Sequence, residues 1–386
     1  MGKWFDDRFK HFAVGALSLL AKTGFGARRI VEDEPEPGSL ILCNHTCVFD
    51  FAFLLFALRP RTDIRFVATG VQFDKSRFKR WAFGHLEVIR KEQGTQDARC
   101  VREIIRTVRG GKVAALYAAG MTSYDGREAW DAMPGTGSLA HMLKCPVYTA
   151  ITSGGFLSHP RFAGRTCRGR VEIRVKRILT AEESTALSAD EIQARMNEAL
   201  RFNDWDWQTR TPHAFRGMKD MTGVTNTLYR CPDCGREGTL DGAKGHIVCS
   251  ACGMDAVRDR YGFFSSVKGN CPSRMDVWTD GELETLREEL KKEDFCLRET
   301  VTMQEGNGGE YADSDEGTLR LTKQELIFSG KKQDEHIGLK EFQFMILNDR
   351  DHIQINLPSR SLRFVFKNTR LITKWFFAHR MMMQND

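Results

Sequence analysis

The chain has 386 residues, of which 41% are hydrophobic and 28% charged. This length exceeds what a single hydrophobic core usually organises, so two or three domains are expected. The composition is that of a globular protein and excludes a disordered or fibrous chain. The formal net charge of +6 favours acidic partners, either phospholipid headgroups or nucleic acid, without choosing between them.

The N-terminal residues predict an amphipathic helix rather than a membrane span. Hydrophobic side chains recur there at helical spacing, at Phe5, Phe9, Phe12, Ala16 and Leu19. The uncharged run from Phe12 to Ala21 is about half of the roughly 20 residues that a spanning helix needs. The pattern fits a helix lying in a membrane interface, and equally one packed on its own domain.

Cysteine usage and the N-terminus together indicate the compartment. The 11 cysteines are an odd number, and residues 1–22 lack the small-residue cleavage site of a signal peptide. We therefore expect a reducing, cytoplasmic location, at the peripheral face of a membrane.

Up to about residue 180, β-rich runs alternate with helical stretches. The runs are residues 39–43, 63–69, 86–90, 113–117, 147–151 and 171–178. Alternation of this kind predicts an α/β domain with a largely parallel sheet. A helix is expected over residues 95–111, and the capping box Ser188–Glu191 predicts the start of another.

The seam between the first apolar strand and the helix after it carries His45 and Asp50. On an ideal helix these side chains lie some 140° apart and cannot touch. They meet if His45 lies in the turn and Asp50 in the first helical turn, with Thr46 or Cys47 near the N-cap. Asp50 then orients one imidazole nitrogen and leaves the other free as a base. No protein nucleophile adjoins the pair, so the substrate's own hydroxyl is the expected nucleophile.

Four cysteines in residues 229–253 form two C-x-x-C pairs, Cys231/Cys234 and Cys249/Cys252. Two such pairs joined by a hairpin predict a tetrahedral, structural zinc (Zn²⁺) site. A redox role for either pair is the alternative. The segment carries few cations and no interleaved aromatic residues, so nucleic-acid binding is not expected.

The motif "NHTCVFD" (44–50) matches the N-H-x4-D signature of the glycerolipid acyltransferases, the family of lysophosphatidate acyltransferase. Three further blocks follow in the family's order. "GHLEVIR" (84–90) resembles the second block and keeps Gly84 and Arg90, and "CPVYTAI" (145–151) resembles the fourth. "LYAAGMTSYDGR" (116–127) lies in the place of the third. The resemblance covers roughly residues 1–215, and the whole chain looks like a bacterial subgroup with a zinc ribbon and a β-rich tail.

The resemblance implies acyl transfer from a thioester, on acyl-CoA or acyl-ACP (acyl carrier protein), to the hydroxyl of a lysophospholipid at a membrane surface. It assigns His45 as general base and Asp50 as the residue that orients it. Arg90, in the same block as Gly84, would bind the phosphate of the acceptor, because a guanidinium is a planar, permanently charged fork.

The third block departs from the family. Residues 118–120 read Ala-Ala-Gly where Pro-Glu-Gly is usual, and Thr122 stands in place of an arginine. Gly120, Thr122 and Ser123 remain as candidates to approach a phosphate through backbone N–H groups. Arg127 is a candidate to supply the missing charge. The identity of the acceptor is therefore open, and so is a non-catalytic, lipid-binding or scaffold role.

The C-terminal part is β-rich. A charged helix is expected over residues 281–295, alternating patterns follow at 317–330, 336–347 and 352–367, and residues 368–383 have helical spacing. The acidic segment 306–317 reads as a loop. About six strands and one amphipathic helix resemble a pleckstrin-homology or GRAM-like barrel, with a protein or lipid partner left open.

The predicted fold class is therefore α/β: a glycerol-phosphate acyltransferase-like mixed sheet with flanking helices, a zinc ribbon, and a small β-barrel-like C-terminal domain. The expected domains are 1–215, an acyltransferase domain with an N-terminal interfacial helix; 216–295, the four-cysteine ribbon and a helical linker; and 296–386, the GRAM/PH-like domain.

Overall fold

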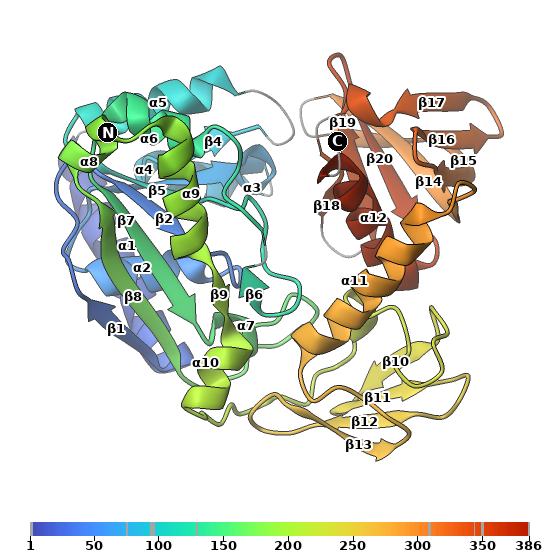
Figure 1. Cartoon of the computed structure of the whole chain (residues 1–386). Coiled ribbons are helices and arrows are strands. Elements are labelled where there is room, and N and C mark those ends of the chain that lie inside the picture. The colour runs from blue at the N-terminus through green and yellow to red at the C-terminus, as the bar shows by residue number, and fades with distance from the viewer. Residues whose placement is uncertain are drawn as a thin grey trace.

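The computed structural model describes residues 3–74, 76–92, 97–128, 130–307, 310–342, 344–348 and 351–384. Figure 1 shows an N-terminal α/β domain, a small β-rich segment below it, and a C-terminal β domain joined to that segment by one long helix. The N-terminal domain is built on a seven-stranded sheet with the order β1-β8-β7-β2-β5-β3-β4. Its strands are β1 (Ala27–Val31), β2 (Leu40–Cys43), β3 (Ile64–Thr69), β4 (Ile89–Lys91), β5 (Val113–Tyr117), β7 (Val147–Ser153) and β8 (Val171–Leu179).

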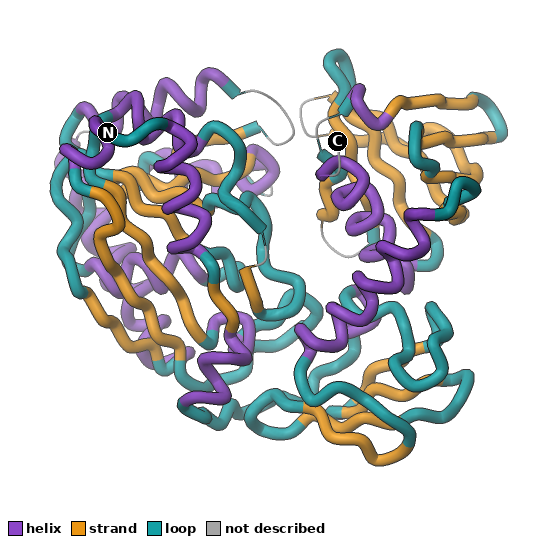
Figure 2. The backbone as a smooth tube through the Cα atoms, viewed as in Figure 1, coloured by secondary structure: helices purple, strands orange, loops and turns teal. Residues whose placement is uncertain are grey.

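The sheet is mixed, because β7 and β8 pair antiparallel while every other neighbouring pair is parallel. The central strand β2 is buried throughout and reads as a continuous apolar run, as expected for a strand covered on both faces. Helices cover both faces in Figure 2. The helices of this domain are α1 (Lys3–Phe25), α2 (Asp50–Leu58), α3 (Gly70–Asp74), α4 (Arg77–His85), α5 (Ala98–Arg109), α6 (Thr136–Leu143), α7 (Gly155–Ser158), α8 (Ala181–Ala186), α9 (Ala189–Leu200) and α10 (Asp204–Arg210).

Two hydrophobic clusters flank the sheet. Helices α1 and α2 close one face, with Phe25 and Phe53 in its core. Helices α5, α6 and α9 close the other, with Ile104, Leu139 and Met196 in its core. The capping box at the start of α9 is present, since the Ser188 side chain accepts from the backbone N–H of Glu191 and the Glu191 carboxylate accepts from Ser188.

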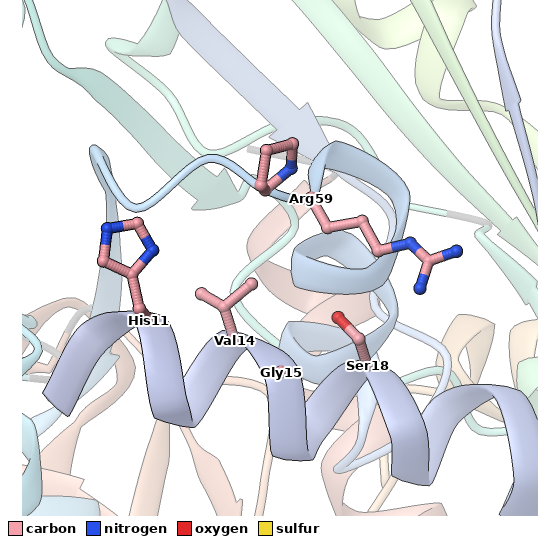
Figure 3. Close-up of a pocket in the computed structure, with 6 residues that line it drawn as sticks. His11, Val14, Gly15, Ser18 and Arg59 are labelled. Carbon is pink, nitrogen blue, oxygen red and sulfur yellow. The ribbon is translucent and has the colours of Figure 1, made fainter. Parts of the chain in front are cut away.

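A cavity separates part of α1 from the loop that follows α2 (Figure 3). It has a volume of about 370 Å³ and is lined by His11, Val14, Gly15, Ser18, Arg59 and Pro60. Helix α1 is thus packed on the domain along one face and leaves a hollow in the middle of that contact.

Three sequence expectations for the strands differ from the structure. The run 86–90 becomes strand only from Ile89, because α4 extends to His85 and Glu87 adopts a left-handed conformation with φ of 53°. Strand β1 was not expected, because only Ala27 of its five residues is buried and an edge strand gives a weak apolar pattern. In the acidic segment expected as a loop, residues 310–317 belong to strand β15 (Glu310–Leu321).

The β-rich segment is a four-stranded antiparallel sheet in the order β10-β11-β12-β13. Its strands are β10 (Leu240–Ala243), β11 (His246–Cys249), β12 (Asp255–Arg258) and β13 (Phe264–Lys268), preceded by the 3-10 turn η1 (Val224–Asn226). One hydrophobic cluster joins Phe156 and Trp205 of the α/β domain to Ile247 and Trp278. The predicted boundary at 215/216 stays a prediction, with this shared core lying across it.

Helix α11 (Met275–Lys291) ties the segment to the rest of the chain. The buried carboxylate of Glu282 accepts hydrogen bonds from the backbone N–H groups of Tyr229 and Arg230, both at 2.7 Å. Lys374, on helix α12 (Ile372–Gln384), bridges Glu237 at 2.8 Å and Glu289 of α11 at 2.6 Å. The two helices and the β-rich segment therefore share a network of buried charges.

The C-terminal domain is a curled seven-stranded antiparallel sheet, in the order β17-β16-β15-β14-β20-β19-β18, with α12 packed on it. Beside β15 its strands are β14 (Leu297–Asn307), β16 (Glu325–Gly330), β17 (Asp334–Gly338), β18 (Ile346–Asn348), β19 (His352–Asn356) and β20 (Ser361–Phe366), with the turns η2 (Leu339–Glu341) and η3 (Thr369–Leu371). The expectation of about six strands missed the long β14–β15 hairpin. Within the described residues β17 and β18 are edges, so the sheet curls without closing.

Candidate active site

His45 and Asp50 meet at the carboxyl end of the central strand. Strand β2 ends at Cys43 and helix α2 begins at Asp50. The Asp50 carboxylate lies 2.7 Å from Nδ1 of His45. It also accepts from the backbone N–H groups of Thr46, at 2.6 Å, and Cys47, at 3.0 Å, and from the Thr46 hydroxyl at 2.6 Å. This set of donors suits an ionised carboxylate and folds the turn around it.

The strand–turn–helix arrangement predicted for this seam is present, with one correction. The N-cap of α2 is Phe49, and not Thr46 or Cys47, because the turn is two to three residues longer than the sequence suggested. Neither Thr46 nor Cys47 is the N-cap residue of α2. Instead, the backbone N–H groups of both residues donate to the Asp50 carboxylate.

The imidazole of His45 is held on two sides and open on a third. Its Nδ1 faces Asp50, and the ring of Tyr117 at the end of β5 lies 4.6 Å away, tilted by 31°. The His45 side chain is 24% exposed, whereas that of Asp50 is 2% exposed. With Nδ1 donating to the carboxylate, Nε2 carries the lone pair and is the nitrogen available to a proton donor.

Two cysteines close to the pair are poor nucleophiles. Burial, and then the charge of Asp50, raise the pKa of the Cys43 and Cys47 thiols well above the usual range. A thiolate is the reactive form of cysteine, so neither side chain is suited to form an acyl-enzyme. The arrangement favours direct attack by a substrate hydroxyl.

The position of the turn is fixed by Asn44. Its side-chain amide donates to the carbonyl of Thr152 at 2.9 Å, and its side-chain oxygen accepts from the N–H of Thr152 at 2.8 Å. These two bonds join the ends of β2 and β7, and all the groups involved are buried. The turn that carries His45 is therefore anchored to the neighbouring strand.

The loop in the place of the third sequence block lies against His45. The N–H of Ser123 donates to the His45 carbonyl at 2.7 Å, and the Ser123 hydroxyl donates to the Arg127 carbonyl at 2.8 Å. The N–H of Gly120 donates to the Tyr117 carbonyl at 3.0 Å. The N–H groups of Gly120 and Ser123 thus donate within the chain, and their phosphate role stays a prediction. Thr122 is half-buried in the same loop.

Arg127 does not supply the missing charge beside His45. Its guanidinium pairs with Asp125 at 2.8 Å and with Asp280 of helix α11 at 2.5 Å. It belongs to the contact between the α/β domain and α11.

Glu128 is a buried carboxylate that the sequence did not single out. It lies in the short strand β6 (Arg127–Glu128), which pairs with β9 (Phe202–Asn203), and its Oε2 accepts from the N–H of His45 at 3.3 Å. The side chain is only 7% exposed, and burial raises its pKa to about 8. Glu128 lies nine residues beyond the place expected for a glutamate, Ala119, and its carboxylate contacts the backbone of His45.

The second sequence block is placed farther away. Arg90 in β4 pairs with Asp74 at 2.9 Å and Glu92 at 2.6 Å. Strands β3 and β5 separate β4 from β2, so about 14 Å of sheet lies between Arg90 and the strand that ends at His45. With Arg65 and Arg99, Arg90 lines a cavity of about 350 Å³. Gly84 is exposed in α4, and a Cβ there would meet nothing within 4 Å.

The four cysteines come together as predicted. The sulfur atoms of Cys231, Cys234, Cys249 and Cys252 all lie within 4.8 Å of one another. The pairs Cys231–Cys252 and Cys234–Cys249 are each 3.8 Å apart. A tetrahedral zinc ion with Zn–S bonds of about 2.3 Å separates its ligands by about 3.8 Å, so this geometry fits zinc.

Both cysteine pairs use the same backbone turn. Gly235 and Gly253 directly follow the second cysteine of each pair, with φ of 72° and 75°. Their N–H groups donate to the carbonyls of Cys231 and Cys249, each at 2.9 Å. Only glycine adopts this conformation without strain, which explains the repeated C-x-x-C-G pattern.

Residues 28–153 match the protein-family model described as Acyltransferase. The matched range contains His45, Asp50 and all four sequence blocks. This segment is therefore similar to the Acyltransferase family. A comparison with curated proteins found no match to the chain.

Among solved structures, the 1-acyl-sn-glycerophosphate (LPA) acyltransferase PlsC from Thermotoga maritima is similar to part of this chain. It is 17% identical, with a TM-score of 0.40, over 50% of this chain and 78% of that chain. Inner Membrane Complex Sub-compartment Protein 3 from Toxoplasma gondii is 12% identical over 26% of this chain and 86% of that chain, with a TM-score of 0.19. The C-terminal domain of an unknown protein from Leishmania infantum is 11% identical over 27% and 98%, with a TM-score of 0.18. These TM-scores are too low for the likeness to support a function.

Replacing Glu128 with Gln should change the pH dependence of stability. Because burial raises the pKa of Glu128 from 4.5 to about 8, the stability this group contributes is complete below pH 4.5 and is lost as the pH rises toward 8. The variant should therefore gain stability over the native chain between pH 5 and pH 8, by up to about 4 kcal/mol. Urea unfolding at both pH values measures the difference. The exposed Glu284→Gln variant serves as control, and equal gains in both variants would contradict the assignment.

Replacing Cys231 with Ser should remove most of the bound zinc and lower the Tm by roughly 10 °C, since the metal holds the segment's fold. Metal analysis and thermal unfolding of the purified protein measure both effects. Cys296 is exposed and outside the cluster, so Cys296→Ser should leave zinc content and Tm as they are. A Cys231→Ser protein with native zinc content would disprove the site.

Proposed function

We propose that the chain transfers a fatty acyl group from acyl-CoA or acyl-ACP to the hydroxyl of a lysophospholipid of the 1-acyl-glycerol-3-phosphate type. The main support is the His45–Asp50 pair, at 2.7 Å, in the segment that matches the Acyltransferase family model. A buried aspartate and a partly exposed histidine are the arrangement that general-base catalysis needs.

In the proposed reaction, Nε2 of His45 takes the proton from the acceptor hydroxyl. The oxygen attacks the thioester carbonyl, a C–O bond forms, and the C–S bond breaks. The imidazolium then returns its proton to the departing thiolate, which leaves as a thiol. Asp50 holds the ring in the tautomer with Nδ1–H and stabilises the imidazolium, while Tyr117 restricts the ring plane.

The four cysteines have a separate, structural role in this proposal. Zinc bound by Cys231, Cys234, Cys249 and Cys252 would have all four positions filled by sulfur, which leaves no site for a substrate. Its contribution is to the fold of the segment that carries α11.

A different acceptor, or lipid binding without turnover, is the alternative. Arg90 is already paired with two carboxylates, and the third-block loop carries neither of the charged side chains usual in the family. A phosphate at Arg90 has to displace those carboxylates, whereas a neutral hydroxyl acceptor does not.

Exposed hydrophobic and basic side chains on α1 and α4 support the proposal of lipid substrates. In the described part of the chain, no helix combines the length and apolarity needed to cross a membrane. Trp4, Phe12 and Leu19 of α1 and Phe78 of α4 are exposed, and the two helices touch through Phe9 and Trp81, whose rings lie 5.0 Å apart. Arg77 and Lys79 are exposed beside Phe78. We propose that this face rests on an anionic membrane surface.

Replacing His45 with Ala should lower kcat/KM for acyl transfer by about 10²- to 10⁴-fold, because the general base is lost, while lipid binding stays near native. The assay uses labelled acyl-CoA or acyl-ACP with a panel of lysolipids, with and without a headgroup phosphate. His336→Ala, in the exposed part of β17, is the matched control. Native activity in the His45 variant would disprove the mechanism. If the native protein transfers no acyl group with any combination of donor and acceptor, the lipid-binding alternative is favoured.

The double variant Phe12→Ser/Phe78→Ser should bind phosphatidylglycerol vesicles at least about tenfold more weakly, because two large apolar side chains no longer enter the interface. Vesicle co-sedimentation measures this. Val267 is as exposed but lies in β13, so Val267→Ser should bind as the native protein does. Equal binding by all three proteins would rule out this face as the docking surface.

A further inference from the structure

Helix α12 of the C-terminal domain packs on the loop that holds His45. Tyr124 of the loop belongs to the C-terminal hydrophobic core, where its ring lies 5.2 Å from Phe376 and 5.3 Å from Phe377. Trp130 stacks on Phe377 at 6.1 Å. Figure 1 shows α12 on the side of the C-terminal domain that faces the acyltransferase domain. The loop is therefore shared between the two domains.

The guanidinium of Arg380, near the end of α12, contacts this loop. Its guanidinium lies 3.7 Å above the ring of Trp130, and Nη1 is 3.2 Å from the sulfur of Met121. Both contacts are to loop residues that flank Ser123, whose N–H bonds to His45. The carboxylates of Glu128 and Asp131 act on it electrostatically.

The charge of Arg380 is incompletely neutralised. Within the described ranges it has no carboxylate at ion-pair distance, and burial lowers its pKa to about 10. Lys374, one turn and a half earlier on α12, is also buried but pairs with Glu237 and Glu289. Arg258 is buried without a carboxylate as well, but it is enclosed in the core, whereas Arg380 is partly exposed. A partly desolvated guanidinium that keeps an open side is suited to an incoming anion.

Glu128 links Arg380 to the catalytic pair. Its carboxylate accepts a hydrogen bond from the N–H of His45 and acts electrostatically on Arg380. Arg380 contacts Met121 and Trp130, and the backbone of His45 bonds to Ser123 and Glu128, so the two residues contact neighbouring parts of one segment.

We propose that Arg380 binds a phosphate group of a substrate, so that the C-terminal domain completes the acyl-transfer site. This inference rests on the proposed acyl transfer. The phosphomonoester of a lysolipid acceptor and the phosphates of coenzyme A share this chemistry, and a guanidinium binds either through two parallel N–H···O bonds.

The test compares substrates with and without phosphate in the Arg380→Gln and Arg380→Lys variants. With lysophosphatidate as acceptor, Arg380→Gln should raise KM about 10- to 100-fold with a smaller change in kcat, and Lys should restore part of the loss. With monoacylglycerol the variant should match the native protein. If Arg380→Gln instead raises KM with acyl-CoA as donor, whichever acceptor is used, and has no effect with acyl-pantetheine, the bound phosphate is that of the donor.

Arg370→Gln is the matched control, because Arg370 joins the C-terminal domain to Asp241 of the zinc segment and has no contact with the third-block loop. Arg370→Gln should leave the ratio of the KM for lysophosphatidate to the KM for monoacylglycerol as it is in the native protein. An equal loss with phosphorylated and unphosphorylated substrates, or the same effect in Arg370→Gln, would show that Arg380 only holds the domains together and would overturn the proposal.

A binding measurement separates this inference from the proposed reaction. Binding to phosphatidylcholine vesicles containing either lysophosphatidate or monoacylglycerol is measured for the native and Arg380→Gln proteins. If the native protein transfers no acyl group yet prefers lysophosphatidate in an Arg380-dependent way, acyl transfer is wrong and the phosphate site stands. If no preference exists and none of the kinetic differences appears, the phosphate site is wrong.

Discussion

The arrangement of the candidate site depends on the carboxylate of Asp50. It lies at the N-terminus of α2, where the helix dipole favours an anion, and it collects donors from His45, Thr46 and Cys47. One side chain therefore folds the turn, starts the helix and orients the imidazole. Burial, and then the same charge, raise the pKa of the neighbouring Cys43 and Cys47 thiols, which keeps them protonated. The fold of the turn and the proposed general-base chemistry therefore both depend on the Asp50 carboxylate.

A second constraint is the way in which His45 is held from behind. Asn44 ties the turn to β7, while the backbone N–H and carbonyl of His45 are bound by Glu128 and Ser123. The main chain of the histidine is thereby fixed by two different segments. This arrangement leaves Nε2 as the one polar atom of the residue that faces a substrate.

The sequence predicted those parts of the structure that depend on local pattern. The strand over 113–117, the capping box at Ser188 and the meeting of His45 with Asp50 follow from apolar runs, helix start signals and short chain distances. The gathering of the two C-x-x-C pairs was predicted in the same way, because the cysteines of a metal ligand set recur at fixed spacing. Each of these features is decided within a few residues.

The features that the sequence did not predict depend on contacts between segments that are far apart in the chain. Glu128 lies beside His45 because β6 pairs with β9, and no local sequence pattern predicts that pairing. Arg380 contacts Met121 from 259 positions away along the chain. The acidic run 306–317 has the composition of a loop, yet pairing with β14 and hydrogen bonds from Lys332 and Gln333 to Asp315 make it a strand. In these places tertiary contacts override local preference.

The shared loop also bears on how much of the chain forms one working unit. Met121, Tyr124 and Trp130 lie inside the segment that matches the acyltransferase family, yet their apolar surfaces are covered by α12. A fragment ending before the C-terminal domain would present these side chains to water, beside the backbone that fixes His45. Removal of the C-terminal domain is therefore expected to lower solubility and to disorder this loop.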